Sequence, residues 1–453
     1  MAQRKKESEM HKVLVLGAGL VSKPLVRYLL EKPDFHVKVA SRTVSKAEKL
    51  IDNHPDGEAQ SLNVKDTAAL GKLVQEADLV ISLLPYIHHV TVAEFCLRHR
   101  KNMVTTSYVS EAMQKLDSRA KEAGLLVLNE IGVDPGIDHM SAMKIIHGVQ
   151  NAGGEIISFR SYCGGLPAPE ANTNPYGYKF SWSPRAVLLA GKNRGRYLQD
   201  GKEVNIPGED LFAHYSTIDI EGFGELEYYT NRDSIPYMET YGIQTTKTMF
   251  RGTLRYPGWC QTLKKMVELG LLDETEREDL KGLTCAQFIA KLIESSNGAN
   301  LKKELASYLK IAEDSEVIKR FEWLGLLSDE PLPLEKGSAM GILGELMLEK
   351  MPYEEGERDM IILHHEFVAE YPKENRKEKI FSTLIDFGIP HGDSSMSRTV
   401  SLPAAIGAKL ALEGKIDATG VHIPVSPAIY EPILEELERL GIAFKERSEK
   451  MEF

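Results

Sequence analysis

The chain is poor in cysteine, with four in 453 residues. Cys96, Cys163, Cys260 and Cys285 are far apart in the sequence and form no CxxC pair. A disulfide framework or a zinc motif needs paired or closely spaced cysteines, so neither is indicated and a reducing compartment is expected. No metal site is expected, because the neighbouring histidines at 88–89 lack a third ligand.

Long hydrophobic runs and an excess of positive charge are also lacking. No apolar stretch approaches the ~18 residues that cross a bilayer, so no membrane partner is expected. The formal net charge of -11 argues against nucleic acid or an anionic membrane as a main partner, although local arginines can still bind a small anion. Residues 1–10 are charged without a hydrophobic core, so they do not resemble a secretory signal, and their mixed charges fit a mitochondrial presequence poorly.

The rest of the composition is that of an ordinary globular protein. Hydrophobic residues make up 42% and charged residues 27% of the chain. A length of 453 residues is enough for two or three domains, each with its own core.

The most informative stretch is VLVLGAGLVS, residues 13–22. An apolar β-branched run leads into Gly17 and Gly19, and a helical pattern follows. Strand, tight glycine turn and helix in this order indicate a dinucleotide-binding site, although a plain strand-to-helix turn gives the same spacing. Gly17 lets the chain turn sharply, and Gly19 leaves room for a pyrophosphate at the helix start. Ser22 takes the third small position, where its hydroxyl can reach a phosphate.

A second strand is predicted over residues 35–41, ending about 20 residues beyond the glycines, where a ribose-binding residue is expected. The residues there are Ser41, Arg42 and Thr43, with no carboxylate. A hydroxyl and a guanidinium suit the 2′-phosphate of NADP. Alternatively, Arg42 stacks on the adenine ring and accepts either cofactor, and the local chemistry leaves both readings open.

Strand and helix patterns alternate from residue 11 to about residue 130, including a strand over 59–64 and a helix over 112–123. Such alternation predicts a parallel, doubly wound sheet. Ligands then bind beyond the carboxyl ends of the strands. The segments expected at that edge are Ser41-Arg42, Asn63-Val64, Ser82-Leu83-Leu84, Ser107-Tyr108 and Asn129-Glu130.

The pattern changes after Asp134. Strand signals and long loops rich in glycine, proline and aromatic residues come first, and a helical stretch follows over about 258–326, including a predicted helix at 275–282. Strand signals return at 359–371 and 378–388, so a discontinuous sheet domain is expected. An apolar helix is predicted over 403–412.

Several sequence blocks, taken together, carry a family resemblance over essentially the whole chain. They are GAGLVSKP at 17–24, SRT at 41–43, DLVISLLPY at 78–86, VTTSYVS at 104–110, NEIGVDPGIDH at 129–139, SYCGGLPAPE at 161–170, GYKFSWSP at 177–184, NRDS at 231–234 and RGTLRYPG at 251–258. The chain thereby resembles the glutamate-forming saccharopine dehydrogenase (saccharopine reductase) family, which includes the C-terminal domain of the animal bifunctional aminoadipic semialdehyde synthases. The first and third blocks are generic to Rossmann enzymes, and the others are specific.

The resemblance implies an α/β fold: a Rossmann doubly wound parallel sheet plus a mixed α/β substrate and dimerisation domain with a small helical insert. The Rossmann domain is expected at 1–133, with about 393–453 packing back onto it. The α/β domain is expected at 134–260 and 330–392, and the helical insert at 261–329.

The resemblance also implies an activity. The expected reaction is NAD(P)-dependent oxidation of the secondary amine of saccharopine, followed by imine hydrolysis to glutamate and aminoadipic semialdehyde, in lysine catabolism in the mitochondrial matrix. NAD is the expected cofactor, as in the animal enzymes, with NADP as the alternative. A homodimer or higher homo-oligomer is expected, within a longer bifunctional chain. The alternatives are another Rossmann imine or amine dehydrogenase, such as a carboxynorspermidine-type enzyme, and a non-catalytic dinucleotide-binding sensor.

Saccharopine carries three carboxylates, and the resemblance points to residues that bind them. Arg232 is the first expected carboxylate clamp, since a guanidinium binds a carboxylate through two parallel hydrogen bonds. The alternative is a surface salt bridge with Asp233. Gly252, Thr253 and Leu254 are expected to offer backbone donors and a hydroxyl, although an ordinary strand-edge turn is the plainer interpretation.

Asp134 and Tyr108 are the expected catalytic residues. Asp134 precedes a Pro-Gly turn that can aim it at the reacting amine; the alternative is helix capping, which Asp138 can perform instead. Ser107 and Tyr108 follow a strand, where contact with nicotinamide and substrate is favoured over a half-buried aromatic role. His139 is interpreted as a structural hydrogen-bonding residue.

Trp182 is expected to cover the nicotinamide or the substrate, unless it is a core or interface residue. The full set of expected cofactor contacts combines this tryptophan with the strand-end segments. It comprises Gly17, Gly19, Leu20, Val21, Ser41, Arg42, Thr43, Asn63, Val64, Ser82, Leu83, Ser107, Val133 and Trp182.

Overall fold

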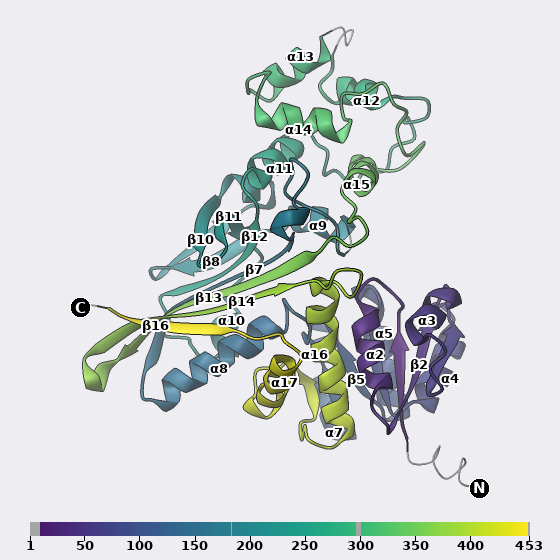
Figure 1. The fold of residues 1–453 in the computed structure, drawn as a ribbon, viewed down its shortest axis with the longest axis vertical. Coiled ribbons are helices and arrows are strands. Elements are labelled where there is room, and N and C mark those ends of the chain that lie inside the picture. Colours follow the sequence, from purple (N-terminus) through teal and green to yellow (C-terminus); the bar gives the residue numbers. More distant parts are fainter. Residues whose placement is uncertain (1–9, 183, 296–299, 452–453) are drawn as a thin grey trace. The chain divides into compact units, whose positions relative to one another are not determined.

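The structure is a computed structural model that describes residues 10–182, 184–295 and 300–451 (Figure 1). The chain forms two compact units. The first comprises the chain up to Glu155, Tyr371–Arg376 and Ser382–Arg447; the second comprises Ile156–Glu370, Lys377–Phe381 and the residues from Ser448 onward.

The first unit contains a seven-stranded sheet with the order β15-β6-β5-β4-β1-β2-β3. Its strands are parallel: β1 pairs with β2 and β4, and the chain of pairings continues to both edges. The strand bounds are β1 His11–Leu16, β2 Phe35–Ser41, β3 Gly57–Ser61, β4 Leu79–Ser82, β5 Asn102–Thr105, β6 Leu126–Leu128 and β15 Gly420–His422. The strand order reverses between β1 and β4, which is where a doubly wound sheet binds its ligand.

The helices of the first unit include those that connect these strands and bury the sheet. They are α2 Ser22–Leu30, α3 Val44–Ile51, α4 Thr67–Glu76, η1 Tyr86–His88, α5 His89–His99, α6 Glu111–Gln114, α7 Asp117–Ala123, α8 Ile137–Asn151, η4 Pro372–Glu374, α16 Ser395–Leu412 and α17 Pro427–Arg439. All four residues of β4 are buried, as the two-sided cover of a parallel sheet requires. The Rossmann part of the expected fold is confirmed.

Some element bounds differ from those predicted. The strand predicted over 59–64 is β3, which ends at Ser61. The helix predicted over 112–123 is broken into α6 and α7 at Lys115 and Leu116. The helix predicted over 403–412 begins two turns earlier, at Ser395 in α16, with Ser394 as the capping residue. Proline favours the first turn of a helix. Here Pro403 lies inside α16, and the residues on either side of the proline are buried.

The first boundary also lies further along the chain than the expected residue 133. Helix α8 belongs to the first unit because it packs against α17. His147 of α8 contributes to this packing through a 2.9 Å hydrogen bond between its Nδ1 and the hydroxyl of Tyr430.

The second sheet has nine strands in the described residues, with the main order β10-β11-β12-β7-β13-β14-β16; β8 pairs with β12, and β9 pairs with β8. It is mixed: β12 is parallel to β7 and antiparallel to β11. The bounds are β7 Glu155–Pro167, β8 Gly195–Gln199, β9 Lys202–Ile206, β10 Tyr215–Ile220, β11 Gly224–Thr230, β12 Thr248–Arg255, β13 Asp359–Tyr371, β14 Arg376–Phe387 and β16 Lys445–Met451. The mixed α/β part of the expected fold is therefore present.

The helices of the second unit include the expected helical insert. Their bounds are η2 Pro169–Ala171, α9 Pro184–Ala190, η3 Gly208–Ala213, α10 Tyr237–Thr240, α11 Trp259–Glu268, α12 Cys285–Leu292, α13 Leu301–Tyr308, α14 Glu316–Leu324 and α15 Ala339–Lys350. The prediction of a helix over 275–282 is wrong, because this stretch forms turns and a β-bridge between Arg277 and Gly337. A capping box between Thr284 and Gln287 starts α12 immediately afterwards.

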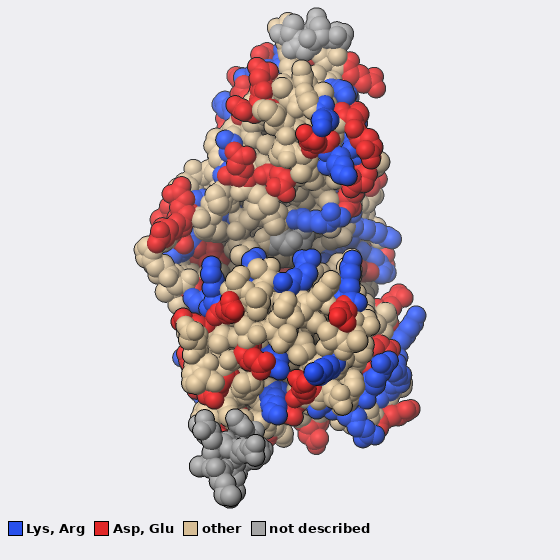
Figure 2. Space-filling view, turned by 90° about the vertical axis from the view of Figure 1, so that its right-hand side faces the viewer, with Lys and Arg blue, Asp and Glu red and all other residues tan. Residues whose placement is uncertain are grey.

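Charged side chains of both signs cover the surface. Figure 2 shows acidic and basic groups interspersed over much of the face in view. Among the described residues, no helix combines the length and the apolar character that a membrane span requires.

Candidate functional site

The glycine turn after β1 has the geometry that a pyrophosphate needs. Gly17 has a φ of 115°, and a Cβ there would lie 3.0 Å from the carbonyl oxygen of Leu83. Gly19 has open space where its Cβ would be, with no atom within 4 Å. Leu20, next in the chain, is 72% exposed at the start of α2. An anion can therefore approach the backbone and the positive end of the helix.

Ser22 has a different role from the one expected. Its hydroxyl donates to the carbonyl of Gly17 at 3.3 Å and accepts from the N–H of Gly19 at 3.0 Å. The serine is fully buried. Its hydroxyl closes the glycine turn by bonding to the Gly17 carbonyl and the Gly19 N–H. Ser22 is therefore not the phosphate contact that we expected.

The residues after β2 and β3 lie at the same edge of the sheet. Ser41 accepts a hydrogen bond from the N–H of Thr43 at 3.3 Å, which fixes the turn around Arg42. Arg42 is exposed, and no ion pair is recorded for it among the described residues. Asn63 lies past the end of β3 and accepts from the N–H of Lys65 at 3.1 Å.

A buried histidine connects the ends of β4 and β5. Ser82 Oγ lies 2.9 Å from Nδ1 of His89, and Ser107 Oγ lies 2.8 Å from Nε2 of the same ring. A neutral imidazole can donate through one nitrogen and accept through the other, so it satisfies both hydroxyls. Burial, with a smaller contribution from His88, lowers the pKa of His89 from its ordinary 6.5 to about 4, which keeps the ring neutral.

Tyr108 and Asp134 are brought together from two different strand ends. The Tyr108 hydroxyl donates to Oδ1 of Asp134 at 2.9 Å. Asp134 does not cap α8, whose N-cap is Gly136. Asp138 Oδ1 instead accepts from the N–H of Gly136 at 2.6 Å, and its own N–H donates to the carbonyl of Val133 at 3.0 Å. The carboxylate of Asp134 therefore faces a hydroxyl at the ligand-binding edge of the sheet.

The second unit holds the residues expected to bind carboxylates. Arg232 is exposed in the loop after β11. Asp233, its expected salt-bridge partner, pairs instead with Arg196 at 3.1 Å. Gly252, Thr253 and Leu254 lie within β12, a central strand that the sequence analysis missed. The pairing of β12 with both neighbours uses backbone donors there, so the side-chain polar group that this segment offers is the Thr253 hydroxyl, which hydrogen-bonds Tyr229.

Two arginines of β12, Arg251 and Arg255, are buried. Arg251 lies over the ring of Tyr237, with its guanidinium carbon 4.4 Å from the ring centroid. Arg255 donates to the carbonyl of Leu254 at 2.7 Å and packs against Tyr178 and Trp259. Its Nε has no hydrogen-bond partner within the described part of the chain. Trp182 is 37% exposed, and Cys163 is buried in β7.

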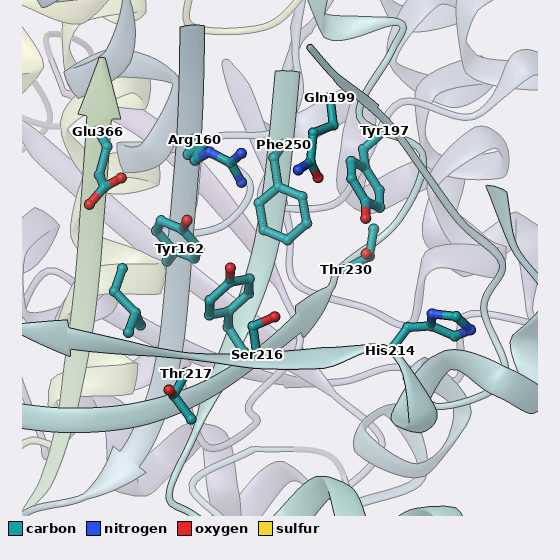
Figure 3. Close-up of a pocket in the computed structure, with 12 residues that line it drawn as sticks. Arg160, Tyr162, Tyr197, Gln199, His214, Ser216, Thr217, Thr230, Phe250 and Glu366 are labelled. Atoms are coloured by element: carbon teal, nitrogen blue, oxygen red, sulfur yellow. The ribbon is translucent and has the colours of Figure 1, made fainter. Parts of the chain in front are cut away.

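A hollow of about 370 Å³ lies on the second unit's sheet (Figure 3). Arg160 and Tyr162 line it from β7, Tyr197 from β8 and Phe250 from β12, with the Arg160 guanidinium carbon 5.9 Å from the Phe250 ring centroid. The sequence analysis identified none of these residues. The alternation of side chains along each strand is the only local signal for these residues. It does not indicate which strands are neighbours in the sheet.

Sequence reasoning also missed His89 as part of the site, and it placed Glu130 at the ligand-binding edge without a role there. His89 was interpreted only as half of a histidine pair, and Glu130 only as a strand-end residue. Both are buried and contact the segment that follows β5. Among the described residues, no cluster of histidine, cysteine and carboxylate side chains is suited to hold a metal ion.

Comparison with known proteins identifies related sequences over nearly the whole chain. Residues 13–128 match the family described as "Saccharopine dehydrogenase NADP binding domain", and residues 132–442 match "Saccharopine dehydrogenase C-terminal domain". The chain is 42% identical over 446 residues to a saccharopine dehydrogenase [NADP(+), L-glutamate-forming] of Schizosaccharomyces pombe, covering 96% of this chain and 99% of that protein. It is 38% identical over 447 residues to the mouse mitochondrial alpha-aminoadipic semialdehyde synthase, covering 97% of this chain and 48% of that protein.

A solved structure shows the same fold. The apo saccharopine dehydrogenase (L-Glu forming) from Saccharomyces cerevisiae matches with a TM-score of 0.89 and 39% identity, over 97% of this chain and 100% of that one. Both sheets, the glycine turn and the paired Tyr108 and Asp134 thus occur in a chain that belongs to the saccharopine dehydrogenase family.

Proposed function

We propose that this chain oxidises saccharopine to glutamate and aminoadipic semialdehyde, as a glutamate-forming saccharopine dehydrogenase of lysine degradation. The observation that carries the proposal is the hydrogen bond between Tyr108 and Asp134 at the carboxyl edge of the Rossmann sheet. A carboxylate at this edge suits the removal of a proton from an amine beside a bound dinucleotide. The names of the relatives, which match over nearly the whole chain, support the same reaction.

Oxidation of a secondary amine needs its lone pair to be free. Asp134 accepts the amine proton, and the Tyr108 hydroxyl holds the carboxylate in place and stabilises its charge. A bound nicotinamide would supply the acceptor for the hydride that leaves the lysine-derived carbon of saccharopine. The resulting substrate imine takes up water, and Asp134 can return a proton as the carbinolamine breaks down to glutamate and the aldehyde.

The substrate's carboxylates need cationic and hydroxyl partners. We assign Arg232 to one of them, because it is exposed in the loop after β11 and a guanidinium binds a carboxylate through two parallel hydrogen bonds. The Thr253 hydroxyl is assigned to a second. Arg251 and Arg255 are buried against aromatic rings, so they are less suited to a soluble substrate than the exposed Arg232.

The cofactor we propose is NADP. The sequence analysis favours NAD from the animal relatives, but the family description and the fungal relatives name NADP. The residues present fit this group: Gly19 leaves space for the pyrophosphate, and Arg42 offers an exposed guanidinium without a recorded ion pair among the described residues. The contact of Arg42 with a 2′-phosphate would distinguish NADP from NAD.

The test is the near-ultraviolet absorbance of reduced nicotinamide after mixing the purified chain with saccharopine and either cofactor. We expect absorbance to grow with NADP and to depend on saccharopine. The variant Arg232→Ala should raise KM for saccharopine at least ~10-fold. The control variant Arg277→Ala, in the helical insert, should leave KM unchanged. Cofactor binding without turnover would favour a sensor module instead.

Two further expectations of the resemblance remain proposals. We infer that the protein is a homodimer that associates through the sheet face around the hollow in Figure 3, where half-buried Arg160, Tyr197 and Tyr228 gather. We also propose a mitochondrial location and a longer bifunctional parent chain, supported by the name and length of the mouse relative. Fractionation of cells and the mass of the native protein on an immunoblot test both points.

A further inference from the structure

A second carboxylate lies behind the Tyr108–Asp134 pair and has no part in the proposed chemistry. Glu130 follows β6 and is 5% exposed. Its φ of 53° is in the left-handed region, which residues other than glycine rarely adopt. A carboxylate is costly to bury unless hydrogen bonds or ion pairs compensate it, and unusual backbone conformations gather at functional sites. The partners of Glu130 therefore indicate what it holds in place.

Glu130 fixes the backbone on both sides of Tyr108. Its N–H donates to the carbonyl of Ser107 at 3.1 Å. Its Oε1 accepts from the N–H of Val109 at 2.9 Å. Tyr108 is the single residue between these two positions, so its backbone cannot shift along the chain without breaking one of the bonds.

The other carboxylate oxygen is fixed by α8. Glu130 Oε2 lies 2.9 Å from Nε2 of His139, which is fully buried in the first turn of that helix. The residue before this histidine, Asp138, holds Val133 and Gly136 by hydrogen bonds. Asp134 lies between those two residues, so the loop that carries it is tied to the same turn of α8.

We propose that Glu130 and His139 are positioning residues that hold the Tyr108 hydroxyl against Asp134. The inference rests on the proposed function, in which this pair handles the amine proton. Tyr108 follows β5 and Asp134 follows β6. Glu130 holds the Tyr108 segment and the first turn of α8 holds the Asp134 segment, so the Glu130–His139 hydrogen bond connects the two segments. Such support matters because a shift of about 1 Å in a reacting group can cost about 100-fold in rate.

A double-mutant cycle tests the proposal in the full chain. Glu130→Ala and Tyr108→Phe are made singly and together, and kcat and KM for saccharopine and the affinity for NADPH are measured. We expect each single variant to lower kcat ~10- to 100-fold with little change in NADPH affinity. The double variant should be no more than about threefold below the worse single variant, because both changes remove one unit.

Glu130→Gln is the conservative variant. Its amide oxygen can still accept from Val109, and its NH₂ group can donate to Nε2 of His139 once the ring carries its proton on Nδ1 instead, so kcat should stay within about threefold of the unchanged protein. Losses that multiply in the double variant, or a Tyr108→Phe variant with full kcat, would overturn the positioning role. Failure of the unchanged chain to oxidise saccharopine would instead overturn the proposed function.

Amide hydrogen exchange decides the inference without relying on activity. Glu130→Ala should speed exchange at least ~10-fold in a peptide over 104–112, because the Val109 N–H loses its acceptor. Glu436→Ala is the matched control, since Glu436 lies in the same unit and hydrogen-bonds Tyr28 and Lys409 instead. Unchanged exchange over 104–112 in Glu130→Ala would overturn the proposal.

Discussion

Arg42 is the residue whose contribution can be separated most cleanly from the rest of the cofactor site. It is exposed, no ion pair is recorded for it among the described residues, and it follows β2, where a ribose contact is expected. Arg42→Asp should weaken NADP binding by ~10- to 100-fold and NAD binding far less, because a charge-assisted hydrogen bond contributes about 1.5–3 kcal/mol.

Fluorescence titration with NADPH and NADH measures this selectivity. Lys49→Asp, on the exposed side of α3, makes the same change in net charge away from the turn after β2 and is the control. Equal losses for both cofactors would show that Arg42 does not bind the 2′-phosphate.

At this scale the sequence predicts residue types better than contacts. The glycines and the Ser-Arg-Thr turn are local features, so their positions follow from spacing, whereas their ligand roles have alternatives that spacing does not decide. For Asp134 the sequence offers catalysis or helix capping, and it favours catalysis because Asp138 can cap instead. In the structure, the Asp138 carboxylate accepts a hydrogen bond from the N–H of Gly136. The Asp134 carboxylate accepts one from the hydroxyl of Tyr108, which follows a different strand. The role of Glu130 depends on Val109, 21 residues away, and therefore on strand adjacency.

At the scale of elements, His89 at the start of α5 couples β4 to β5 and makes stability depend on pH. Its pKa is about 4 in the folded chain, against an ordinary value of 6.5, because burial disfavours the charged ring. The unfolded chain therefore binds the proton more readily between these values. The free energy of unfolding should fall by up to about 3 kcal/mol as the pH drops from above 6.5 towards 4.

Urea unfolding at several pH values, with and without His89→Gln, measures this contribution. The variant cannot take up the proton, so its stability should depend less steeply on pH between 4 and 6.5. An identical slope in both proteins would contradict the assignment. The variant should also be less stable at neutral pH, because Ser82 and Ser107 are bonded to the imidazole.

Elements with strong local patterns were predicted well. The strand over 35–41 is β2, and the strand over 359–371 is β13. Helix α16 was predicted too short because Pro403 reads locally as a helix start, whereas burial continues the helix through it. β12 was missed because glycine and arginine interrupt its apolar pattern, and only its place between β11 and β7 makes it a strand.

At the scale of the whole molecule, the association of two copies is a separate question from catalysis. Tyr197 lies on the hollowed face of the second sheet and is half-buried. Tyr197→Glu should raise the dimer dissociation constant at least ~10-fold, because it puts a charge into a buried contact.

Sedimentation equilibrium gives the mass of the particle directly. The unchanged protein should have twice the mass of one chain. Tyr308→Glu, at a 48% exposed tyrosine of α13, is the matched control and should remain dimeric. A monomeric unchanged protein, or a dimer unaffected by Tyr197→Glu, would contradict an interface at this face.

The central claim concerns which carbon–nitrogen bond of saccharopine is broken. The most direct measurement is to identify and count the products formed by the purified chain with saccharopine and NADP. The account predicts one glutamate for each reduced cofactor, with aminoadipic semialdehyde as the other product. Lysine and 2-oxoglutarate as products, or reduced cofactor without any glutamate, would contradict it.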